Sequence, residues 1–335
     1  KQLYLAVPQQ QRMRKPKASQ CAIMLSTAGD YGLTIDEPVY IAGVDDVGRW
    51  FAGLSGEPGI AASLRDEELQ KRWFFARTHN YNLPVPVIIS SVGHALTKGW
   101  VEPLRSYRVG HCLLLAATVG LLFGCFAQSH GREMAAVSMG SLLLMPQVFS
   151  HGHLNATDVP TACFWVWTIV AWLRSESNWR WRLLAALACG LGLATKATFV
   201  LMPGLLAVWM ILSRRWAWWR SLLVVLTGAP VVMLVFCPMW WPAPISRPFE
   251  FFRAAFGGGL DFRVELFYLG QTYIAGRTPI PWHCAFVLPV VATPPWTLAL
   301  AGVAAVRWMR NRTAEIGLWL LGATVLPALR LLPDA

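Results

Sequence analysis

Long apolar runs alternate with short connections over most of the chain after residue 105. The runs cover about residues 107–127, 133–150, 159–173, 183–195, 197–213, 221–241, 283–306 and 314–332. Crossing a hydrocarbon core of about 30 Å takes roughly 20 apolar residues as a helix, and most of these runs approach that length. The pattern therefore predicts an all-α polytopic membrane protein with about eight or nine transmembrane helices.

The first third of the chain is more polar. Residues 1–17 are basic, and we expect them to form a cytoplasmic N-terminus before a transmembrane domain spanning 18–335. Residues 18–35 form a weak span, interrupted by Asp30. Residues 36–105 form a long polar loop that contains an amphipathic segment at 67–74 and an apolar run at 87–96. That run is too short to span, so we expect it to lie in the membrane interface.

Basic residues mark every second connection between the apolar runs. These connections contain Arg132, Arg174, Arg180, Arg182, Arg214, Arg215, Arg220, Arg307, Arg310 and Arg312. Because basic loops stay in the cytoplasm, the remaining connections should share the outer face. Those are the loop at 36–105, the turn at 151–158, the turn near Lys196 and the loop at 242–282.

Composition supports the membrane class and excludes others. The 335 residues are 55% hydrophobic and 14% charged, whereas a soluble domain is about 25% charged. The net charge of +11 fits a positive-inside topology and attraction to anionic lipid headgroups. Because the arginines lie in separate short loops rather than on one face, we do not predict nucleic-acid binding. The seven cysteines lie in or near apolar runs without a CxxC pair, which indicates packing rather than a disulfide framework or a zinc site.

Asp36 and Glu37 are the most informative polar residues. They form an adjacent carboxylate pair where an apolar segment ends, and charges at a membrane boundary are costly unless they have a function. A carboxylate held within about 3 Å of a hydroxyl can accept its proton, which makes Asp36 a candidate general base. The alternative is a solvated helix cap.

The turn from His151 to Pro160 is the second candidate. Its two histidines, His151 and His153, together with Asp158 could bind a metal, but the spacing is a weak signal. Asp158 could instead cap the next helix, whose first turn contains Pro160. It could also orient a substrate, and both interpretations stay open.

Two further residues come from the same expected face. Lys196 lies between two apolar runs, where it must snorkel, pair with an acid or bind an anion such as phosphate. His283 follows Pro281 and Trp282 at the end of a polar loop, where a packed, hydrogen-bonded histidine is the common alternative to a functional one. No Walker, GxGxxG, HExxH or GxSxG motif occurs, so a soluble nucleotide-sugar site is not supported.

Taken in order, these sequence segments resemble a known family, the GT-C membrane glycosyltransferases of glycosyltransferase family 39. The resemblance is to a bacterial branch of this family. This family includes protein O-mannosyltransferases and aminoarabinose transferases. The resemblance covers about residues 31–300. It rests on Asp36-Glu37-Pro38-Val39-Tyr40, Pro84-Val85-Pro86, Arg105-Ser106-Tyr107-Arg108, His151 to Pro160, Gly190 to Lys196, Tyr268-Leu269-Gly270 and Pro281-Trp282-His283.

The resemblance implies transfer of a sugar from a polyprenyl-phosphate donor to an acceptor hydroxyl, with inversion at the anomeric carbon. Asp36 would be the base, with Glu37 shaping the catalytic site, and Lys196 would hold the donor phosphate. The other residues assigned to substrate binding are Tyr40, His151, His153, Asp158 and His283. No cofactor or metal is predicted.

The family also implies partners and a location. The acceptor would be a protein, lipid or glycan, and membrane lipids would surround the bundle. We expect a bacterial plasma membrane with the site on its periplasmic or exterior side. Relatives usually continue beyond this length, so their C-terminal part is expected to be missing. The alternatives are a membrane transporter and an inactive or truncated relative that binds lipid-linked sugar.

Overall fold

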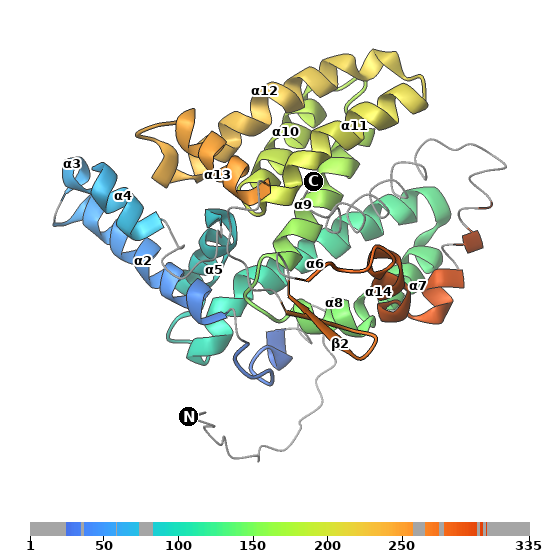
Figure 1. The fold of residues 1–335 in the computed structure, drawn as a ribbon, viewed down its shortest axis with the longest axis horizontal. Helices are drawn as coiled ribbons and strands as arrows, with labels where there is room; N and C mark the ends of the chain where they lie inside the picture. The colour runs from blue at the N-terminus through green and yellow to red at the C-terminus, as the bar shows by residue number, and fades with distance from the viewer. Residues whose placement is uncertain are drawn as a thin grey trace.

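The computed structural model is a bundle of helices with one short β-hairpin beside it (Figure 1). It describes residues 25–34, 37–57, 59–73, 83–256, 265–274, 278–299, 302, 303 and 306. The expected N-terminus at 1–17, residues 18–24 and 35 of the weak span, Asp36 and the expected span at 314–332 lie outside these residues.

Most of the bundle forms from the predicted apolar runs. Its helices are α6 (Pro103–His130), α7 (Arg132–Leu143), α8 (Pro146–His151), α9 (Asp158–Leu173), α10 (Trp179–Leu193), α11 (Leu201–Leu212) and α12 (Trp219–Phe236). Short 3₁₀ turns join or end them: η2 (Ala197–Val200), η3 (Trp216–Trp218) and η4 (Pro238–Trp240). Helix α10 packs against both α9 and α12, while α6 packs against α7 and α9.

The lengths of these helices only partly match the predicted spans. Within the described residues, two segments are long and apolar enough to cross a membrane, Pro103–His130 and Trp216–Phe236. Three more apolar helices are shorter, at Pro84–Thr97, Asp158–Leu173 and Ala197–Leu212. The number of eight or nine transmembrane helices therefore stays a prediction.

Two expected spans are interrupted by proline. The run at 133–150 forms α7 and α8 instead of one helix, because Pro146 occupies the first turn of α8 after a short break. The run at 283–306 gives α14 (Cys284–Ala292), which ends shortly before Pro294 and Pro295.

The segment expected as a polar loop at 36–105 is largely helical where it is described. It contains α2 (Glu37–Ser55), α3 (Ile60–Ser63), α4 (Asp66–Trp73) and α5 (Pro84–Thr97). Helix α4 confirms the amphipathic helix expected from residue 67, as far as the described residues extend. The apolar run at 87–96 belongs to α5, which packs along α6 and α2.

The loop at 242–282 also contains regular structure. It holds α13 (Ser246–Phe256) and an antiparallel hairpin of β1 (Glu265–Tyr268) and β2 (Gln271–Ile274). The two strands are joined by Leu269 and Gly270, whose positive φ angles of 49° and 81° close the turn. At the start of α13, Arg247 pairs with Asp66 at 2.5 Å and so ties this loop to α4.

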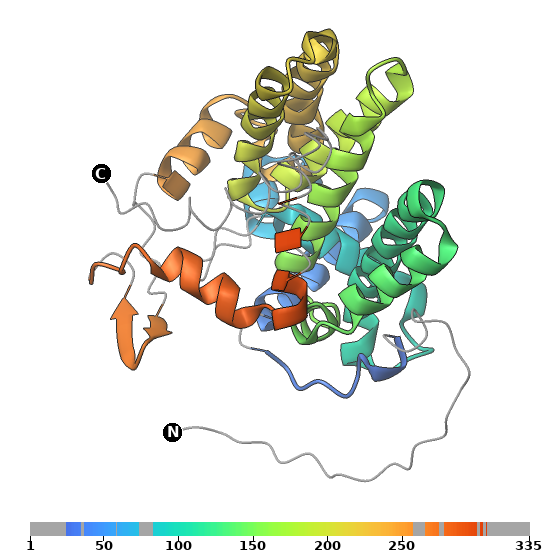
Figure 2. The same cartoon turned by 90° about the vertical axis from the view of Figure 1, so that its right-hand side faces the viewer.

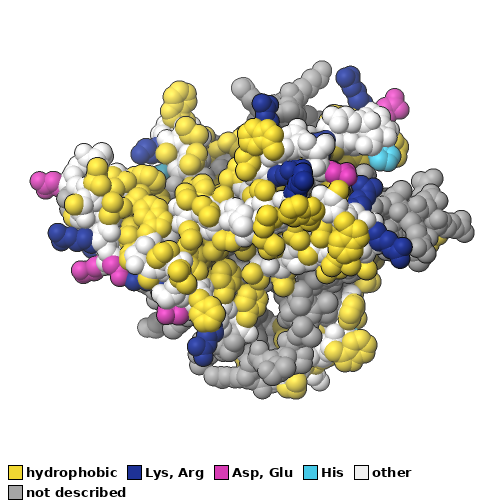
Figure 3. Space-filling view, turned by 90° about the horizontal axis from the view of Figure 1, so that it is seen from above, with side chains coloured by type: hydrophobic (Ala, Val, Ile, Leu, Met, Phe, Trp, Pro, Cys, Tyr) yellow, Lys and Arg dark blue, Asp and Glu magenta, His cyan; other side chains and the backbone are white. Residues whose placement is uncertain are grey.

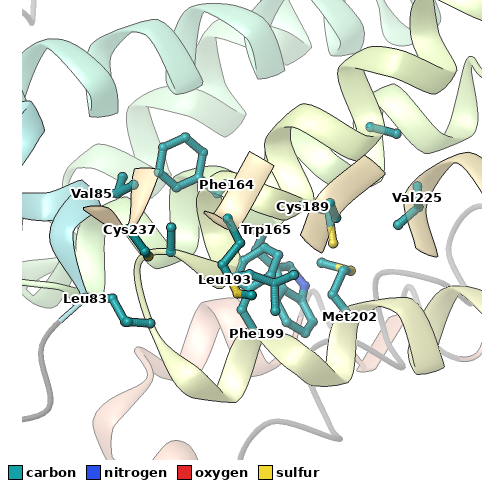
Figure 4. Packing of buried hydrophobic residues seen from close by; sticks show 14 of the residues in the cluster. Leu83, Val85, Phe164, Trp165, Cys189, Leu193, Phe199, Met202, Val225 and Cys237 are labelled. Carbon is teal, nitrogen blue, oxygen red and sulfur yellow. The ribbon is translucent and has the colours of Figure 1, made fainter. Parts of the chain in front are cut away.

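The core lies between α5 and the helices α9 to α12. Phe164 and Trp165 of α9 pack there with Leu193, Phe199 and Val85 (Figure 4). The outside is also apolar: Figure 3 shows a broad hydrophobic face with charged side chains mainly toward its margins. Leucines and valines of α11 and α12 contribute to the exposed apolar surface, as expected for helices that face lipid.

The basic connections lie at one end of the bundle. Arg174, after α9, donates to the Cys125 thiol near the end of α6 at 3.3 Å. The Ser221 hydroxyl, at the start of α12, donates to the Ser175 carbonyl at 3.2 Å. Figure 2 shows the α9–α10 and α11–α12 connections at the same end of the molecule. The alternation of basic loops therefore predicted their common side, while the orientation of that side in the membrane stays a prediction.

Candidate functional site

A buried ion pair between Glu37 and Arg108 forms the centre of the candidate site. Arg108 donates to Glu37 Oε1 from Nε at 2.7 Å and to Oε2 from Nη2 at 2.6 Å. Both side chains are 0% exposed. This two-pronged geometry is the strongest that an arginine and a carboxylate can form, and it fixes the first residue of α2 against the second turn of α6.

The same guanidinium also holds the segment that precedes α2. Its Nη1 donates to the carbonyls of Ala28 at 2.6 Å and Tyr31 at 2.9 Å, and Nη2 donates to Gly32 at 2.9 Å. The Thr34 amide donates to Glu37 Oε2 at 3.0 Å. Thr34 and Glu37, the described residues that flank Asp36, are therefore fixed by one network.

A third element joins this network through Asn155. The Asn155 amide donates to Glu37 Oε1 at 3.0 Å, and its side-chain Nδ2 donates to the Ser90 hydroxyl of α5 at 3.0 Å. Asn155 lies in the turn between α8 and α9, three residues before Asp158. We call Glu37, Arg108 and Asn155 the Glu37 clamp, because together they join α2, α6 and this turn.

The clamp keeps Glu37 ionised. Burial alone raises the pKa of its carboxyl, but hydrogen bonds from Arg108, Asn155 and Thr34 outweigh burial and hold the pKa below its usual 4.5. Arg108, Asn155 and Thr34 all donate to this one carboxylate. Glu37 therefore holds the backbone at Thr34 and Asn155 in place.

The two histidines of the turn have different surroundings. His153 is fully buried; its Nε2 lies 2.8 Å from the Thr27 hydroxyl, its Nδ1 contacts the Phe149 carbonyl, and its ring stacks on Tyr31 at 4.8 Å. It therefore joins the turn to the segment before α2. His151 ends α8 and is exposed.

Asp158 and Lys196 lie together, as their assignment to one face predicted. Lys196 Nζ is 2.8 Å from Asp158 Oδ1, with 26% of the lysine side chain and 54% of the aspartate side chain exposed. Lys196 is placed by the end of α10, where the Ala194 carbonyl accepts the Val85 amide of α5 at 3.1 Å. The pair offers one cation and one anion to solvent at the end of the bundle opposite the basic connections.

Tyr40 and His283 have other surroundings among the described residues. Tyr40, on the buried face of α2, belongs to the apolar core and is 4% exposed. His283 precedes α14, and its ring contacts Tyr268 of β1 at 5.6 Å and Trp282 at 5.8 Å. The described contacts of His283 thus join it to the β-hairpin rather than to the Glu37 clamp.

Arg108 and Asn155 were missed as site residues. Arg108 was part of a motif, yet no role was assigned to it. The available signal was its position: a charged residue within an apolar helix needs a partner, and an unpaired acid was present at Glu37. Asn155 contacts Glu37 through its backbone amide, and no sequence pattern identifies a backbone contact of this kind.

The described residues contain no group of three or more His, Cys, Asp or Glu side chains placed to hold a metal ion. The groups that are present suit other chemistry. Lys196 can contact an anion such as a phosphate, and Asp158 can accept hydrogen bonds from hydroxyls.

The fold and site together define a class of protein: a helical membrane bundle in which a buried acid–arginine clamp lies opposite the basic end. A family model described as "Dolichyl-phosphate-mannose-protein mannosyltransferase" matches residues 84–241. This segment contains Arg108, Asn155, Asp158 and Lys196. No curated protein matches.

Two crystal structures of ArnT from Cupriavidus metallidurans have a similar fold. The apo structure gives a TM-score of 0.56 at 20% identity, covering 81% of this chain and 50% of ArnT. The structure bound to undecaprenyl phosphate gives 0.54 at 20% identity, covering 88% and 55%. The chain thus spans about half the length of ArnT. It has the ArnT fold and resembles the GT-C membrane glycosyltransferases, which confirms the resemblance identified in the sequence.

Proposed function

We propose that this chain carries the sugar-transfer site of a GT-C glycosyltransferase. The donor is a sugar linked to a polyprenyl phosphate, and the acceptor is a hydroxyl of a protein, lipid or glycan. The Glu37 clamp is the observation that carries this proposal. One buried carboxylate fixes the described neighbours of Asp36 and the turn leading to Asp158, within or next to the segment matched by the mannosyltransferase model.

The chemistry is inverting transfer with Asp36 as general base. Asp36 accepts the proton of the acceptor hydroxyl as its oxygen attacks the anomeric carbon. The bond between that carbon and the donor phosphate breaks on the opposite side, and the lipid phosphate leaves with the bonding electrons. Lys196 stabilises the charge on the departing phosphate. The ArnT structure bound to undecaprenyl phosphate supports a lipid phosphate as the donor group.

Glu37 acts in this proposal as a positioning residue. Its carboxylate accepts four hydrogen bonds and is fully buried, so it is poorly suited to meet a substrate. Asp158 holds Lys196 in place before the donor binds, and the donor phosphate then competes for the ammonium group. Substrate-binding roles for Tyr40, His151, His153 and His283 stay predictions.

The site faces the periplasm or exterior in this proposal, in the plasma membrane of a bacterium. The support is geometric: the Asp158–Lys196 pair and the basic connections occupy opposite ends of α9 and α10. A basic end in the cytoplasm therefore leaves the pair outside.

Transfer assays on membranes test the base directly. Membranes carrying the chain are incubated with radiolabelled polyprenyl-phosphate sugars, and Asp36→Asn is compared with Asp46→Asn, whose carboxylate forms a surface pair with Arg49. We expect Asp36→Asn to lower transfer about 10²- to 10⁴-fold and Asp46→Asn to leave it unchanged. Equal transfer by wild type and Asp36→Asn would exclude this base. Absence of transfer by wild type with every donor would overturn the activity.

The donor role of Lys196 has a separate readout. Lys196→Met should lower kcat/KM for the labelled donor about 100-fold, because a cation is lost beside the departing phosphate. Asp158→Asn, which keeps the lysine, should have a smaller effect. An unchanged kcat/KM in Lys196→Met would show that the phosphate lies elsewhere.

A further inference from the structure

Four arginine–tryptophan pairs gather at the basic end of the bundle. The guanidinium carbon lies 5.0 to 6.0 Å from the indole centroid in each of them. The pairs are Arg174 with Trp181, Arg180 with Trp179, Arg215 with Trp218, and Arg220 with Trp219. They belong to the α9–α10 and α11–α12 connections, which the Ser221–Ser175 hydrogen bond joins.

Among the described residues, these guanidinium groups have no acidic partner. Within the described part of the chain, none of the four arginines forms an ion pair with a carboxylate. Glu176 is the acidic residue in these two connections, and its backbone carbonyl accepts from Arg182 at 2.6 Å. The basic end therefore presents a concentrated positive charge.

One of these tryptophans is fixed in the core, whereas Trp179 and Trp219 are 62% and 53% exposed. Trp218 is 1% exposed and packs against Trp172 and Trp209, with ring centroids 5.3 and 5.0 Å away. A guanidinium stacked on a fixed indole keeps its N–H edge free to donate. That edge matches two oxygens of a phosphate group.

Exposed leucines continue directly from the charged end. Leu183 and Leu187 lie one turn apart on α10, and Leu212 and Leu223 flank the α11–α12 connection; their exposures are 51%, 41%, 69% and 51%. A small soluble anion has no hydrocarbon group that could pack against these leucines. A ligand with a phosphate head and hydrocarbon chains fits both parts.

We infer that the basic end binds the phosphate headgroup of an anionic phospholipid, with Arg180, Arg215 and Arg220 as donors and the neighbouring leucines along the acyl chains. This inference is independent of the proposed sugar transfer. It assigns a lipid-binding site to a surface at the other end of the bundle.

Retention of lipid by the full chain provides the test. Purified protein is equilibrated with equal amounts of phosphatidylglycerol and phosphatidylcholine of the same acyl chains, and bound lipid is counted by native mass spectrometry. We expect a preference for phosphatidylglycerol that falls at least about tenfold in the triple variant Arg180→Gln, Arg215→Gln, Arg220→Gln. The control variant Arg49→Gln, Lys71→Gln, Lys98→Gln removes the same charge from exposed sites elsewhere and should retain the preference.

Two further arms separate this site from simpler explanations. Replacing the same three arginines by lysine keeps the charge but loses the flat fork, so the preference should also fall. An undiminished preference in the lysine variant, or equal loss in the control variant, would leave only a general field and overturn the site. Displacement of phosphatidylglycerol by an equal concentration of glycerol phosphate would indicate a soluble anion and overturn the lipid assignment. Circular dichroism checks that the variants remain folded.

Discussion

At the scale of single residues, the Glu37–Arg108 pair determines the local architecture. Removing both charges from water costs several kcal/mol per ion, which mutual attraction offsets only with full hydrogen bonding. Arg108 meets this condition by donating to three backbone carbonyls as well as to Glu37. The pair therefore selects one arrangement of the segment before α2, rather than adding much net stability.

Breaking one half of the pair should be more harmful than removing both halves. Glu37→Gln leaves Arg108 buried without its counter-ion, and we expect it to lower the free energy of unfolding by about 3–5 kcal/mol. The double variant Glu37→Gln, Arg108→Gln should lose less than the two single variants combined. Denaturant titration in detergent micelles, followed by tryptophan fluorescence, measures these values. Asp46→Asn weakens two surface ion pairs, with Arg49 and Arg72, and should cost only about 1 kcal/mol. A loss in Glu37→Gln no larger than the loss in Asp46→Asn would contradict the buried ion pair.

Acid should weaken the protein through the same carboxylate. The pKa of Glu37 is lower in the folded chain than its usual 4.5, so the folded state binds its proton less readily than the unfolded chain. The resulting stability is complete above the usual pKa and is lost as pH falls through the lowered value. Unfolding measured from pH 7 downward should show this loss in wild type and a smaller slope below pH about 4.5 in Glu37→Gln. Identical slopes in the two proteins would assign the acid sensitivity to other groups.

The sequence identified one of the three residues of the Glu37 clamp. An Asp-Glu pair at the end of an apolar segment is visible in a short window, because its cost depends on local surroundings. Its partner Arg108 lies 71 residues away. No local pattern specifies a contact at that distance. The proximity of Asp158 and Lys196 was easier to predict, because the alternation of basic loops assigns both residues to one face.

At the scale of elements, glycines set how closely the helices approach. A Cβ atom on Gly110 of α6 would lie 2.1 Å from the Ile89 carbonyl oxygen of α5, and one on Gly93 would lie 2.4 Å from the Gly110 nitrogen. Backbone thus meets backbone where α5 crosses α6. This close crossing brings Ser90 into reach of Asn155 and so supports the Glu37 clamp.

A matched pair of alanine substitutions on α6 tests this crossing. Gly110→Ala forces two backbones apart and should lower the free energy of unfolding by about 1–3 kcal/mol. Gly120→Ala, where nothing lies within 4 Å, should raise it by about 0.5–1 kcal/mol through helix propensity. Both are measured by denaturant titration. If Gly110→Ala is as stable as Gly120→Ala, the helices do not approach as closely as described.

Long apolar runs were sufficient to predict α6 and α9 to α12, because a membrane helix needs little beyond length and composition. Helix α2 was not predicted. Its buried residues Tyr40, Val44 and Val47 follow helical spacing, but Asp45 and Asp46 interrupt the run, and its burial depends on packing against α5. The breaks at Pro146 and before Pro294 were also missed, since proline only sometimes ends a membrane helix.

At the scale of the whole molecule, the bundle has two chemically different ends. Helices α6, α9 and α10 run from one to the other. Arg108 and Asp158 lie near one end, while Arg174 and Arg180 mark the other. A phosphate group is proposed to bind at each end: that of the sugar donor at one end and that of a phospholipid at the other. The two sites can therefore be separated by mutation, and they require opposite sides of the membrane.

That separation predicts opposite accessibility of two introduced cysteines. Trp100, in the connection between α5 and α6, is 90% exposed, and Ala217, between α11 and α12, is also exposed. Five native cysteines are buried, so replacing Cys21 and Cys125 by serine gives a background of low reactivity. In intact cells, a membrane-impermeant maleimide should label Trp100→Cys but not Ala217→Cys, and lysis should make both reactive, because the basic end is retained in the cytoplasm.

The reverse labelling pattern would invert the molecule and move the proposed transfer site to the cytoplasm. Labelling of both residues in intact cells would show that the two connections share a side, and would contradict the odd number of membrane crossings that two opposite ends require. The opposite labelling of the two residues would show that the chain crosses the membrane an odd number of times between them. That segment contains α6, one of the two described helices long and apolar enough to cross.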